Sequence, residues 1–370
     1  MNMPLKLTDS SQWIAELSRL SATVARISRA SPLPLVAYTD ANGQIAEPDP
    51  YNLANDADHN GAFARCFDGL SANGALDDTL RNYLSTLTNG NNTYGTASEL
   101  LTYLWLLDHH ALFETQIPMT GADILNPNGS DLDGKLTFSS DVFFDIKGFG
   151  FQENAVKRLT DRLEADIPGQ WIAAQGSWDV SAETLEDLLS KGYWPLRDEL
   201  RQNLTARREG LEFVKRDRRP VQVSHRIVDP YQFAAENNSY MFRFAKQFCR
   251  SNPFFLIIAY HPWLGGQGLS TNFADFTATV TRSLARRTFI QFLNDTSPFF
   301  NVTKAEASKL LSGIAFLNVS PLPGKPPKYD LLRLYLNPNA THPIDRLTID
   351  SLALHAPNSV ALDGFRYDNY

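Results

Sequence analysis

The sequence predicts an α/β protein in which a mixed β-sheet is flanked by helices, with further helical regions added at both ends. Two observations lead to this fold class. Apolar residues recur at helical spacing in several segments, and between them lie short alternating or wholly apolar segments of strand length. Hydrophobic residues make up 43% of the 370 residues, which is enough to form a sizeable buried core.

The first region, residues 1–92, is predicted to be mainly helical. Residues 10–30 carry apolar side chains three or four positions apart, which is typical of an amphipathic helix. Residues 32–60 are rich in Pro, Asp and Asn and are expected to form loops. A further helix is predicted over 76–87, and the Asn-Gly-Asn-Asn sequence at 89–92 marks the end of the region.

The central region, residues 93–265, is predicted to hold the sheet. It opens with a helix over 96–109, whose first residues, Thr-Ala-Ser-Glu, fit a capping box. A buried strand is expected over 253–260, where the residues are almost all apolar. Three more strands are predicted over 112–119, 134–138 and 142–149, the last two joined at Ser139 and Ser140.

A basic insertion, at about 153–230, is expected within the central region. It is predicted to be helical, with a strand around 171–174 and an alternating, strand-like segment over 221–227. A helix is expected over 231–250. The remaining residues, 266–370, are predicted to form an α+β region of unknown role. Within that region, helices are expected over 273–293 and 304–311.

The charge of the chain is unevenly distributed. A net charge of −7 counts against indiscriminate binding to nucleic acids, but basic residues are concentrated between Arg201 and Arg226. Such a segment can neutralise backbone phosphates along one face, and the alternative is a solvated surface that binds nothing. The residues expected to contact nucleic acid are Arg207, Arg208, Lys215, Arg216, Arg218 and Arg219.

One short segment combines an apolar strand with two charged residues. Residues two apart on a strand point to the same side, about 7 Å from each other. Asp145 and Lys147 therefore share one face, while the apolar residues between and before them anchor the other. Because burying unpaired charge is costly, these two side chains must pair, reach water or hold a metal. The preceding strand turns back at 139–140 and can bring Asp133 alongside Asp145.

Two aspartates and a lysine in this arrangement suit metal-assisted hydrolysis of a phosphodiester. Mg²⁺, with Mn²⁺ as the alternative, takes one or two carboxylates together with waters and substrate phosphate. The bound metal lowers the pKa of a water, and a lysine can orient that water and stabilise the transition state. The alternative interpretations are a surface ion pair for Asp145 and Lys147, turn formation for Asp133, and helix capping for Glu99.

In the order of these residues the chain resembles the PD-(D/E)XK nuclease superfamily, which has the restriction-endonuclease-like fold. That family carries an acid on one strand, then acid-any-lysine on the next, after a helix that often holds a glutamate. The matching residues are Asp133, Asp145-Ile146-Lys147 and Glu99, within residues 94–262. The resemblance implies that Asp133 and Asp145 bind Mg²⁺ with the Ile146 carbonyl. It also implies that Lys147 assists the attacking water and that Glu99 completes the outer metal shell.

Two features depart from the family pattern. Leu132 stands where the family has a proline before the first acid, and Asp131 is an alternative to Asp133 as that acid. The connection between the motif and the buried strand is also long. It is either an insertion, which we favour, or it contains the closing helix and strand at 156–166 and 171–174.

These features lead us to expect a Mg²⁺-dependent deoxyribonuclease. By analogy with enzymes of this kind, we also expect a role in restriction or phage defence and a homodimer. The alternatives are a catalytically inactive nucleic-acid-binding or assembly module of the same fold, and a helical structural protein. DNA is the expected partner, with RNA as the alternative. Two widely separated cysteines, and apolar runs far shorter than the ~20 residues of a membrane span, favour a cytoplasmic protein without a membrane partner.

Overall fold

The computed structural model describes residues 6–109, 111–149, 153–176, 187–208, 211–217, 230–260, 273–319, 332–355 and 360–363. The chain forms two compact units. The sheet unit comprises Met1–Gly148, Ala245–His261 and Asp295–Tyr370. The insert unit comprises Phe149–Phe244 and Pro262–Asn294.

The described part of the sheet unit begins with six helices. The first five lie in the region predicted to be mainly helical, and the sixth is the helix predicted to open the central region. They are α1 (Ser10–Leu20), α2 (Ala22–Ala30), α3 (Pro48–Ala54), α4 (Ala57–Ala72), α5 (Asp77–Thr88) and α6 (Thr93–Asp108). The single helix predicted over 10–30 is broken at Ser21, whose extended backbone ends α1 and whose side chain caps α2 at the Val24 amide. The prediction of loops over 32–60 is wrong for α3 and the start of α4. There the Asp56 carboxylate accepts two backbone hydrogen bonds and starts α4.

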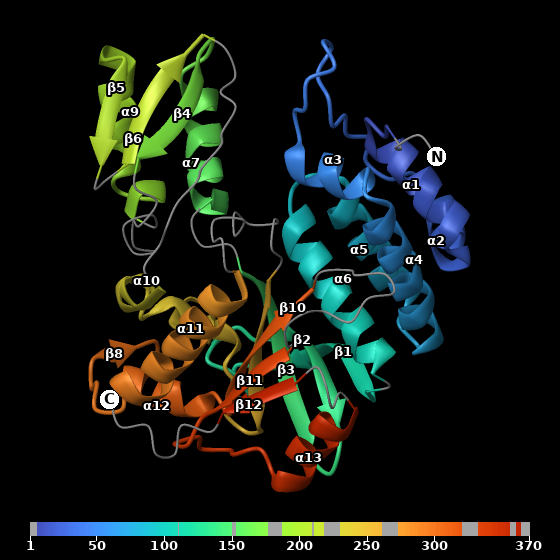
Figure 1. Ribbon diagram of the computed structural model, residues 1–370, viewed down its shortest axis with the longest axis vertical. Helices are drawn as coiled ribbons and strands as arrows, with labels where there is room; N and C mark the ends of the chain where they lie inside the picture. Colours follow the sequence, from blue (N-terminus) through green and yellow to red (C-terminus); the bar gives the residue numbers. More distant parts are fainter. Residues whose placement is uncertain are drawn as a thin grey trace. The chain divides into compact units, whose positions relative to one another are not determined.

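A mixed sheet follows these helices, so the predicted α/β class is confirmed (Figure 1). Its order is β1-β2-β3-β7-β10-β11-β12. The first three strands form an antiparallel meander, β7 is parallel to β3, and β10 is parallel to β7. β11 is antiparallel to β10, and β12 is parallel to β11. The strands are β1 (Phe113–Met119), β2 (Ser130–Thr137), β3 (Asp141–Gly148), β7 (Phe254–Tyr260), β10 (Gly313–Asn318), β11 (Leu332–Leu336) and β12 (Val360–Asp363).

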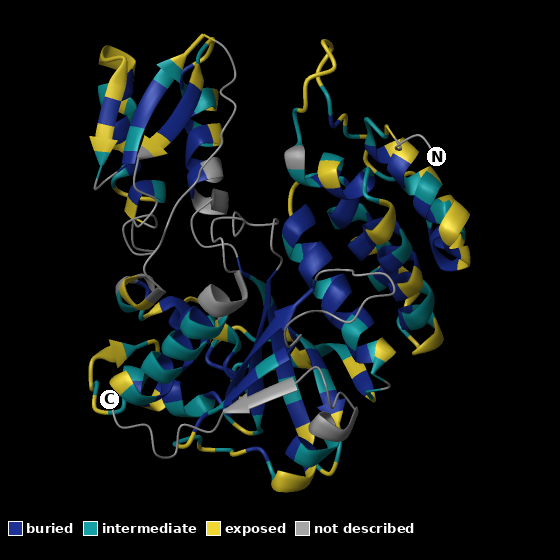
Figure 2. Cartoon of the chain, in the orientation of Figure 1, coloured by how far each residue is buried: buried dark blue, intermediate teal, exposed yellow. Residues whose placement is uncertain are grey.

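The core of the sheet unit is centred on β7 and β10, in which every residue is buried (Figure 2). Helix α6 packs against β3 and β7. The approach to β3 is close at Gly148, where a Cβ would lie 2.8 Å from the ring of Tyr94 and 3.2 Å from the Ser98 Oγ. Glycine at this position therefore lets α6 lie against the end of β3.

The residues of the expected C-terminal region, 266–370, are divided between the two units: the described residues up to Asn294 belong to the insert unit, and three later strands belong to the main sheet. β10, β11 and β12 continue the sheet beyond β7, so the chain is not divided at residue 265 as expected. The reason is that the wholly apolar β7 needs a strand on each side, and β10 supplies the second. The unit also contains the hairpin β8 (Pro298–Phe299) and β9 (Val302–Thr303), and helices α12 (Lys304–Leu310) and α13 (Arg346–His355).

The turn between β2 and β3 is held by α13. Ser139 and Ser140 donate to the carboxylate of Asp345, with Oγ–O distances of 2.6 and 2.5 Å. The same carboxylate caps α13 by accepting from the amide and hydroxyl of Thr348. The hairpin that carries the candidate site is thereby fixed at its turn by a residue about 200 positions later in the chain.

The insert unit is an α/β unit, so the prediction of a helical insertion is wrong for its second half. Two strands form where a helix was expected, because Leu211 and Phe213 alternate with polar residues and enter the core. The elements of this part are α7 (Glu153–Asp166), β4 (Trp171–Gly176), α9 (Tyr193–Gln202), β5 (Thr205–Arg208) and β6 (Leu211–Arg216). The order of its antiparallel sheet is β4-β6-β5. β4 therefore pairs within this small sheet, and β7 is the strand that lies beside β3.

The helix expected over 231–250 is interrupted. It consists of α10 (Pro230–Glu236) and a 3₁₀ helix, η1 (Tyr240–Gln247), separated by Asn-Asn-Ser at 237–239. Asn and Ser side chains compete with the backbone for hydrogen bonds and favour such breaks. The helix predicted over 273–293 is confirmed as α11 (Phe273–Arg286), continued by a π-helical turn, η2 (Arg287–Gln291). The segment expected to alternate over 221–227 lies outside the described residues. Among the helices of the described chain, each is too short or too polar to cross a membrane.

Candidate active site

The candidate site lies where β2 and β3 stop pairing. Their register runs from Thr137 opposite Asp141 to Gly134 opposite Phe144. The next pair would place Asp133 opposite Asp145. Instead, the Asp133 side chain occupies this position, and its Oδ2 accepts a hydrogen bond from the Ile146 amide at 2.6 Å.

The glycine after Asp133 is required by packing. A Cβ on Gly134 would lie 2.3 Å from the Phe144 ring and 2.6 Å from the Glu114 carbonyl oxygen. Real Cβ atoms do not approach other atoms so closely, and one of the two obstacles is backbone. The Asp-Gly pair therefore lets β2 lie close to both neighbouring strands immediately before Asp133 leaves the regular ladder.

Asp145 and Lys147 form an ion pair on β3, as their spacing predicts. The Lys147 Nζ lies 2.6 Å from the Asp145 Oδ2. Asp145 is 1% exposed, whereas 26% of the Lys147 side chain is exposed. Apart from this ion pair, the Asp145 Oδ2 has no hydrogen-bond partner among the described residues. One oxygen of a buried carboxylate thus depends on a single cationic neighbour.

The pKa values of this pair reflect burial and a neighbouring acid. Burial raises the pKa of Asp145 to about 8; the negative charge of Asp133 acts in the same direction, and Lys147 opposes it. Burial lowers the pKa of Lys147, but the charges of Asp145 and Asp133 outweigh it, so the net change is upward. Lys147 is therefore an ammonium at neutral pH.

Glu99 joins these residues from α6. The helix starts at Thr93 with Asn92 as its N-cap, so the expected capping box at Thr96 to Glu99 is wrong. Glu99 lies in the second turn of α6. Burial raises its pKa to about 8, and the charges of Asp133 and Asp145 act in the same direction. Lys147 and a hydrogen bond from Tyr83 act in the opposite direction. Glu99 is therefore near enough to both aspartates to be affected by their charges.

The charges of three carboxyl groups therefore act on one lysine, which pairs directly with Asp145. If all of Glu99, Asp133 and Asp145 were ionised beside Lys147, the group would carry a net charge of −2. In the metal-free site the raised pKa values relieve this repulsion by protonation. A divalent cation would relieve it without protons, because such cations take carboxylate oxygens as ligands. No cluster of three His, Cys, Asp or Glu side chains arranged around one metal position occurs in the described ranges.

Two tyrosines connect the acids, and sequence reasoning missed both. Tyr103 of α6 donates to the Asp133 carbonyl oxygen at 2.8 Å. Its hydroxyl lies 3.2 Å from that of Tyr83 on α5, which also hydrogen-bonds Glu99. Tyr103 follows Glu99 by four residues on the same helix, so the two share a face. That spacing was a signal for Tyr103, whereas Tyr83 enters from another helix and has no sequence signal.

The alternative first acid is placed elsewhere. Asp131 is exposed on β2, opposite Pro118 of β1. No hydrogen bond from its carboxylate to Ile146 or to another site residue is present in the described chain. Asp133 is therefore the acid of β2 that reaches β3.

The residues expected to bind nucleic acid lie in the insert unit. Arg207 pairs with Glu212 at 2.9 Å, and Arg208 pairs with Glu199 at 2.7 Å. Lys215 is half-buried and Arg216 is exposed, both on β6. Arg218 and Arg219 lie outside the described residues. Two of the four described basic side chains thus already have acidic partners.

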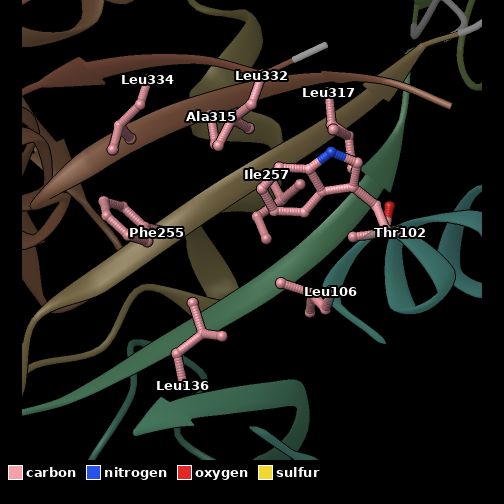
Figure 3. A pocket seen from close by; sticks show the side chains of 10 residues that line it. Thr102, Leu106, Leu136, Phe255, Ile257, Ala315, Leu317, Leu332 and Leu334 are labelled. Carbon is pink, nitrogen blue, oxygen red and sulfur yellow. The ribbon is translucent and has the colours of Figure 1, made fainter. Parts of the chain in front are cut away.

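An apolar pocket of about 20 Å³ lies between α6 and the sheet (Figure 3). Leu136, Phe255, Ile257 and Leu334 line it, and its accessible surface is apolar. A pocket this small and apolar suits neither a metal ion nor a phosphate. The residues of this unit that can bind a metal or a phosphate are therefore the charged ones, Glu99, Asp133, Asp145 and Lys147, and not those of the pocket.

Comparisons of the chain with models of protein families, with curated proteins and with solved structures find no match. The functional assignment rests on the geometry of the site itself.

Proposed function

We propose that this protein is a metal-dependent nuclease that hydrolyses phosphodiester bonds in DNA. One observation carries the proposal. Glu99, Asp133 and Asp145 meet beside Lys147 at the point where β2 and β3 separate. Ion pairs with a purely structural role rarely place three carboxyl groups near one buried lysine, because the excess negative charge destabilises the fold. Such strongly perturbed groups are typical of functional sites.

The carboxylates of Asp133 and Asp145, with the Ile146 carbonyl, would hold a Mg²⁺ or Mn²⁺ ion. The charge of Asp133 raises the pKa of Asp145, so the two carboxyl groups lie near each other, and Lys147 pairs with the Asp145 Oδ2. When bound, the metal supplies an activated water and neutralises charge that develops on the phosphate. By the resemblance to the PD-(D/E)XK superfamily, Glu99 would act on a coordinated water.

Lys147 contributes a fixed positive charge. Because its pKa is raised, its ammonium can donate charge-assisted hydrogen bonds to a phosphate oxygen or to water at neutral pH. Its side chain is partly exposed while its partner Asp145 is buried, so the ammonium is the part of the pair that a substrate can reach. Its role here is to hold and stabilise negative charge.

The fold supports the same proposal. An antiparallel meander is followed by a strand parallel to its last member, with the glutamate-bearing helix against the sheet. This is the arrangement that the resemblance to the PD-(D/E)XK superfamily implies. The long segment between β3 and β7 is then an insertion, since β4 pairs in another sheet.

A second candidate is a module of the same fold that binds without catalysis. The ion pairs of Arg207 and Arg208 favour it, because they leave fewer free cations in the segment expected to grip phosphates. In such a module Lys147 would serve only to neutralise Asp145. Catalysis is what separates the two candidates.

The test is cleavage of supercoiled plasmid with Mg²⁺, with Mn²⁺ and with EDTA, alongside linear duplex, single-stranded DNA and RNA. Lys147→Met and Asp145→Asn are the site variants, and Asp131→Asn is the matched control on the same hairpin. Metal-dependent cleavage that both site variants lose and the control keeps supports the nuclease. Absence of cleavage of every substrate by the folded wild type would refute it.

A further inference from the structure

Gln116 has an unusual backbone conformation beside the site. Its φ is +54°, in the left-handed region, although it lies in the middle of β1. Thr115 pairs with Gly134 and Ile117 pairs with Leu132, so the position opposite Gln116 is Asp133. The regular ladder is interrupted at this one pair. A non-glycine residue held in this region indicates strain that the surrounding structure maintains.

The side chain of Gln116 is directed at the tyrosines of the site. Its Nε2 donates to the Tyr83 hydroxyl at 2.8 Å. Tyr83 and Tyr103 are both buried, and their rings meet edge to face. Through these two hydroxyls Gln116 is linked to Glu99 and to the backbone of Asp133.

Two hydrogen bonds of this network have a fixed direction. Tyr103 donates its single proton to the Asp133 carbonyl oxygen, and the Tyr83 hydroxyl oxygen accepts from the Gln116 amide. The one proton of Tyr83 can then be donated to the Tyr103 hydroxyl or to Glu99. The amide of Gln116 thereby occupies an acceptor position of the Tyr83 oxygen and restricts where the Tyr83 hydroxyl can point.

We propose that Gln116 is a positioning residue for the acidic site. Its left-handed backbone turns the amide toward Tyr83, and Tyr83 and Tyr103 then hold Glu99 and Asp133 in place against their mutual repulsion. This inference rests on the proposed nuclease function. The strain at Gln116 is kept because the site requires it, and it contributes nothing to the stability of β1.

Phe300 provides a matched control. It has the same φ, +54°, and it is 50% exposed in the β8–β9 hairpin. Phe300→Gly replaces a residue with a left-handed backbone conformation in the β8–β9 hairpin. Gln116→Gly replaces such a residue on β1, beside the acidic site. Gly accepts this backbone conformation readily, so both variants relieve the same kind of strain.

The experiment measures kcat and KM on DNA, Mn²⁺ affinity by calorimetry and thermal unfolding. It uses Gln116→Gly, Tyr83→Phe, the double variant and Phe300→Gly. We expect Gln116→Gly to unfold no earlier than wild type, to lose about 10-fold in kcat with KM unchanged, and to bind Mn²⁺ more weakly. We expect the double variant to lose no more than the more impaired of the two single variants, because Gln116 acts through Tyr83. Phe300→Gly is expected to keep wild-type kcat.

The outcomes separate this inference from the proposed function. If wild type neither cleaves nor binds Mn²⁺, the nuclease proposal fails. If wild type is active and Gln116→Gly matches Phe300→Gly in kcat and Mn²⁺ affinity, Gln116 has no positioning role. Additive losses in the double variant would show that Gln116 does not act through Tyr83. Should Gln116→Gly fail to fold, Gln116→Met keeps the length of the side chain, removes the donor and is judged by the same criteria.

Discussion

The ammonium of Lys147 lies 2.6 Å from one carboxylate oxygen of Asp145, two residues earlier on the same strand. Strand geometry alone places both side chains on one face of β3, so this contact follows directly from sequence spacing. The same lysine also faces Asp133 and Glu99, which come from β2 and α6. One ammonium thus interacts electrostatically with three carboxyl groups. The stability of this part of the fold therefore depends on how many of those groups are ionised.

The first prediction concerns pH. The folded-state pKa of Asp145, about 8, is above its ordinary value of 3.8, so the folded protein binds a proton that the unfolded chain releases. The contribution of Asp145 to stability is therefore full below pH 4 and falls as pH rises toward 8, by about 1.4 kcal/mol for each pH unit above the unfolded-state pKa. Asp145→Asn removes this loss. We expect the unfolding temperature of Asp145→Asn, relative to metal-free wild type, to be higher at pH 8.5 than at pH 5.5. A difference that does not change with pH would contradict it.

The second prediction concerns metal binding. A cation that binds ionised Asp133 and Asp145 must displace the proton held there, so its apparent affinity rises with pH. We expect Mg²⁺ to raise the unfolding temperature more at pH 8 than at pH 6, with about 2.7 kcal/mol of stabilisation at 100 times the Kd. Asp145→Asn should abolish the shift and Asp131→Asn should keep it. Equal shifts in both variants would place the metal elsewhere.

Much of this site can be predicted from sequence, because its central part is local. Asp145 and Lys147 lie on one strand, and Asp133 is joined to them by a short turn at residues 138–140, so spacing and a single turn suffice. The hairpin of β2 and β3 and the buried β7 are likewise confirmed, since both depend on short periodic segments. Sequence patterns identify contacts between residues that lie close together in the chain, such as Asp145 and Lys147.

The supporting residues could not be predicted in the same way. Tyr83 reaches Glu99 from a separate helix, and nothing in its own neighbours indicates that contact. The left-handed conformation of Gln116 is imposed by the structure around it, against the preference of its residue type. The helix start at Thr93 also differs from the expected capping box, because the N-cap is Asn92, which makes no side-chain cap hydrogen bond.

The third prediction tests the close approach at Gly134. A Cβ there would meet the Phe144 ring at 2.3 Å and a backbone oxygen at 2.6 Å, so Gly134→Ala forces the strands apart. We expect a loss of about 1–3 kcal/mol and reduced metal binding, since Asp133 is the next residue. Gly61→Ala in α4 is the matched control. Nothing lies within 4 Å of its added Cβ, so it should stabilise the protein by up to about 1 kcal/mol. Thermal unfolding measures both variants: the unfolding temperature should fall for Gly134→Ala and rise for Gly61→Ala.

The last prediction concerns Asp345, which connects α13 to the β2–β3 turn. Hydrogen bonds from Ser139, Ser140 and Thr348 hold the pKa of this carboxyl well below its usual range. Because the folded-state pKa is lowered, the stabilisation is present above pH 4 and is lost as pH falls. At pH 7, Asp345→Ala removes a helix cap and the clamp on the turn together, and we expect it to cost about 1–2 kcal/mol.

The matched control for Asp345 is Asp350 on the same helix. It pairs only with the exposed Arg346 among the described residues, so Asp350→Ala should change stability by at most about 0.5 kcal/mol. Urea unfolding at pH 7 and at pH 3 measures both variants, and the gap between Asp345→Ala and wild type should narrow at the lower pH. Because the clamped turn sets the register of Asp133 against β3, Asp345→Ala should also weaken Mn²⁺ binding, whereas Asp350→Ala should not. Equal Mn²⁺ affinity in the two variants would show that the hairpin keeps its register without α13.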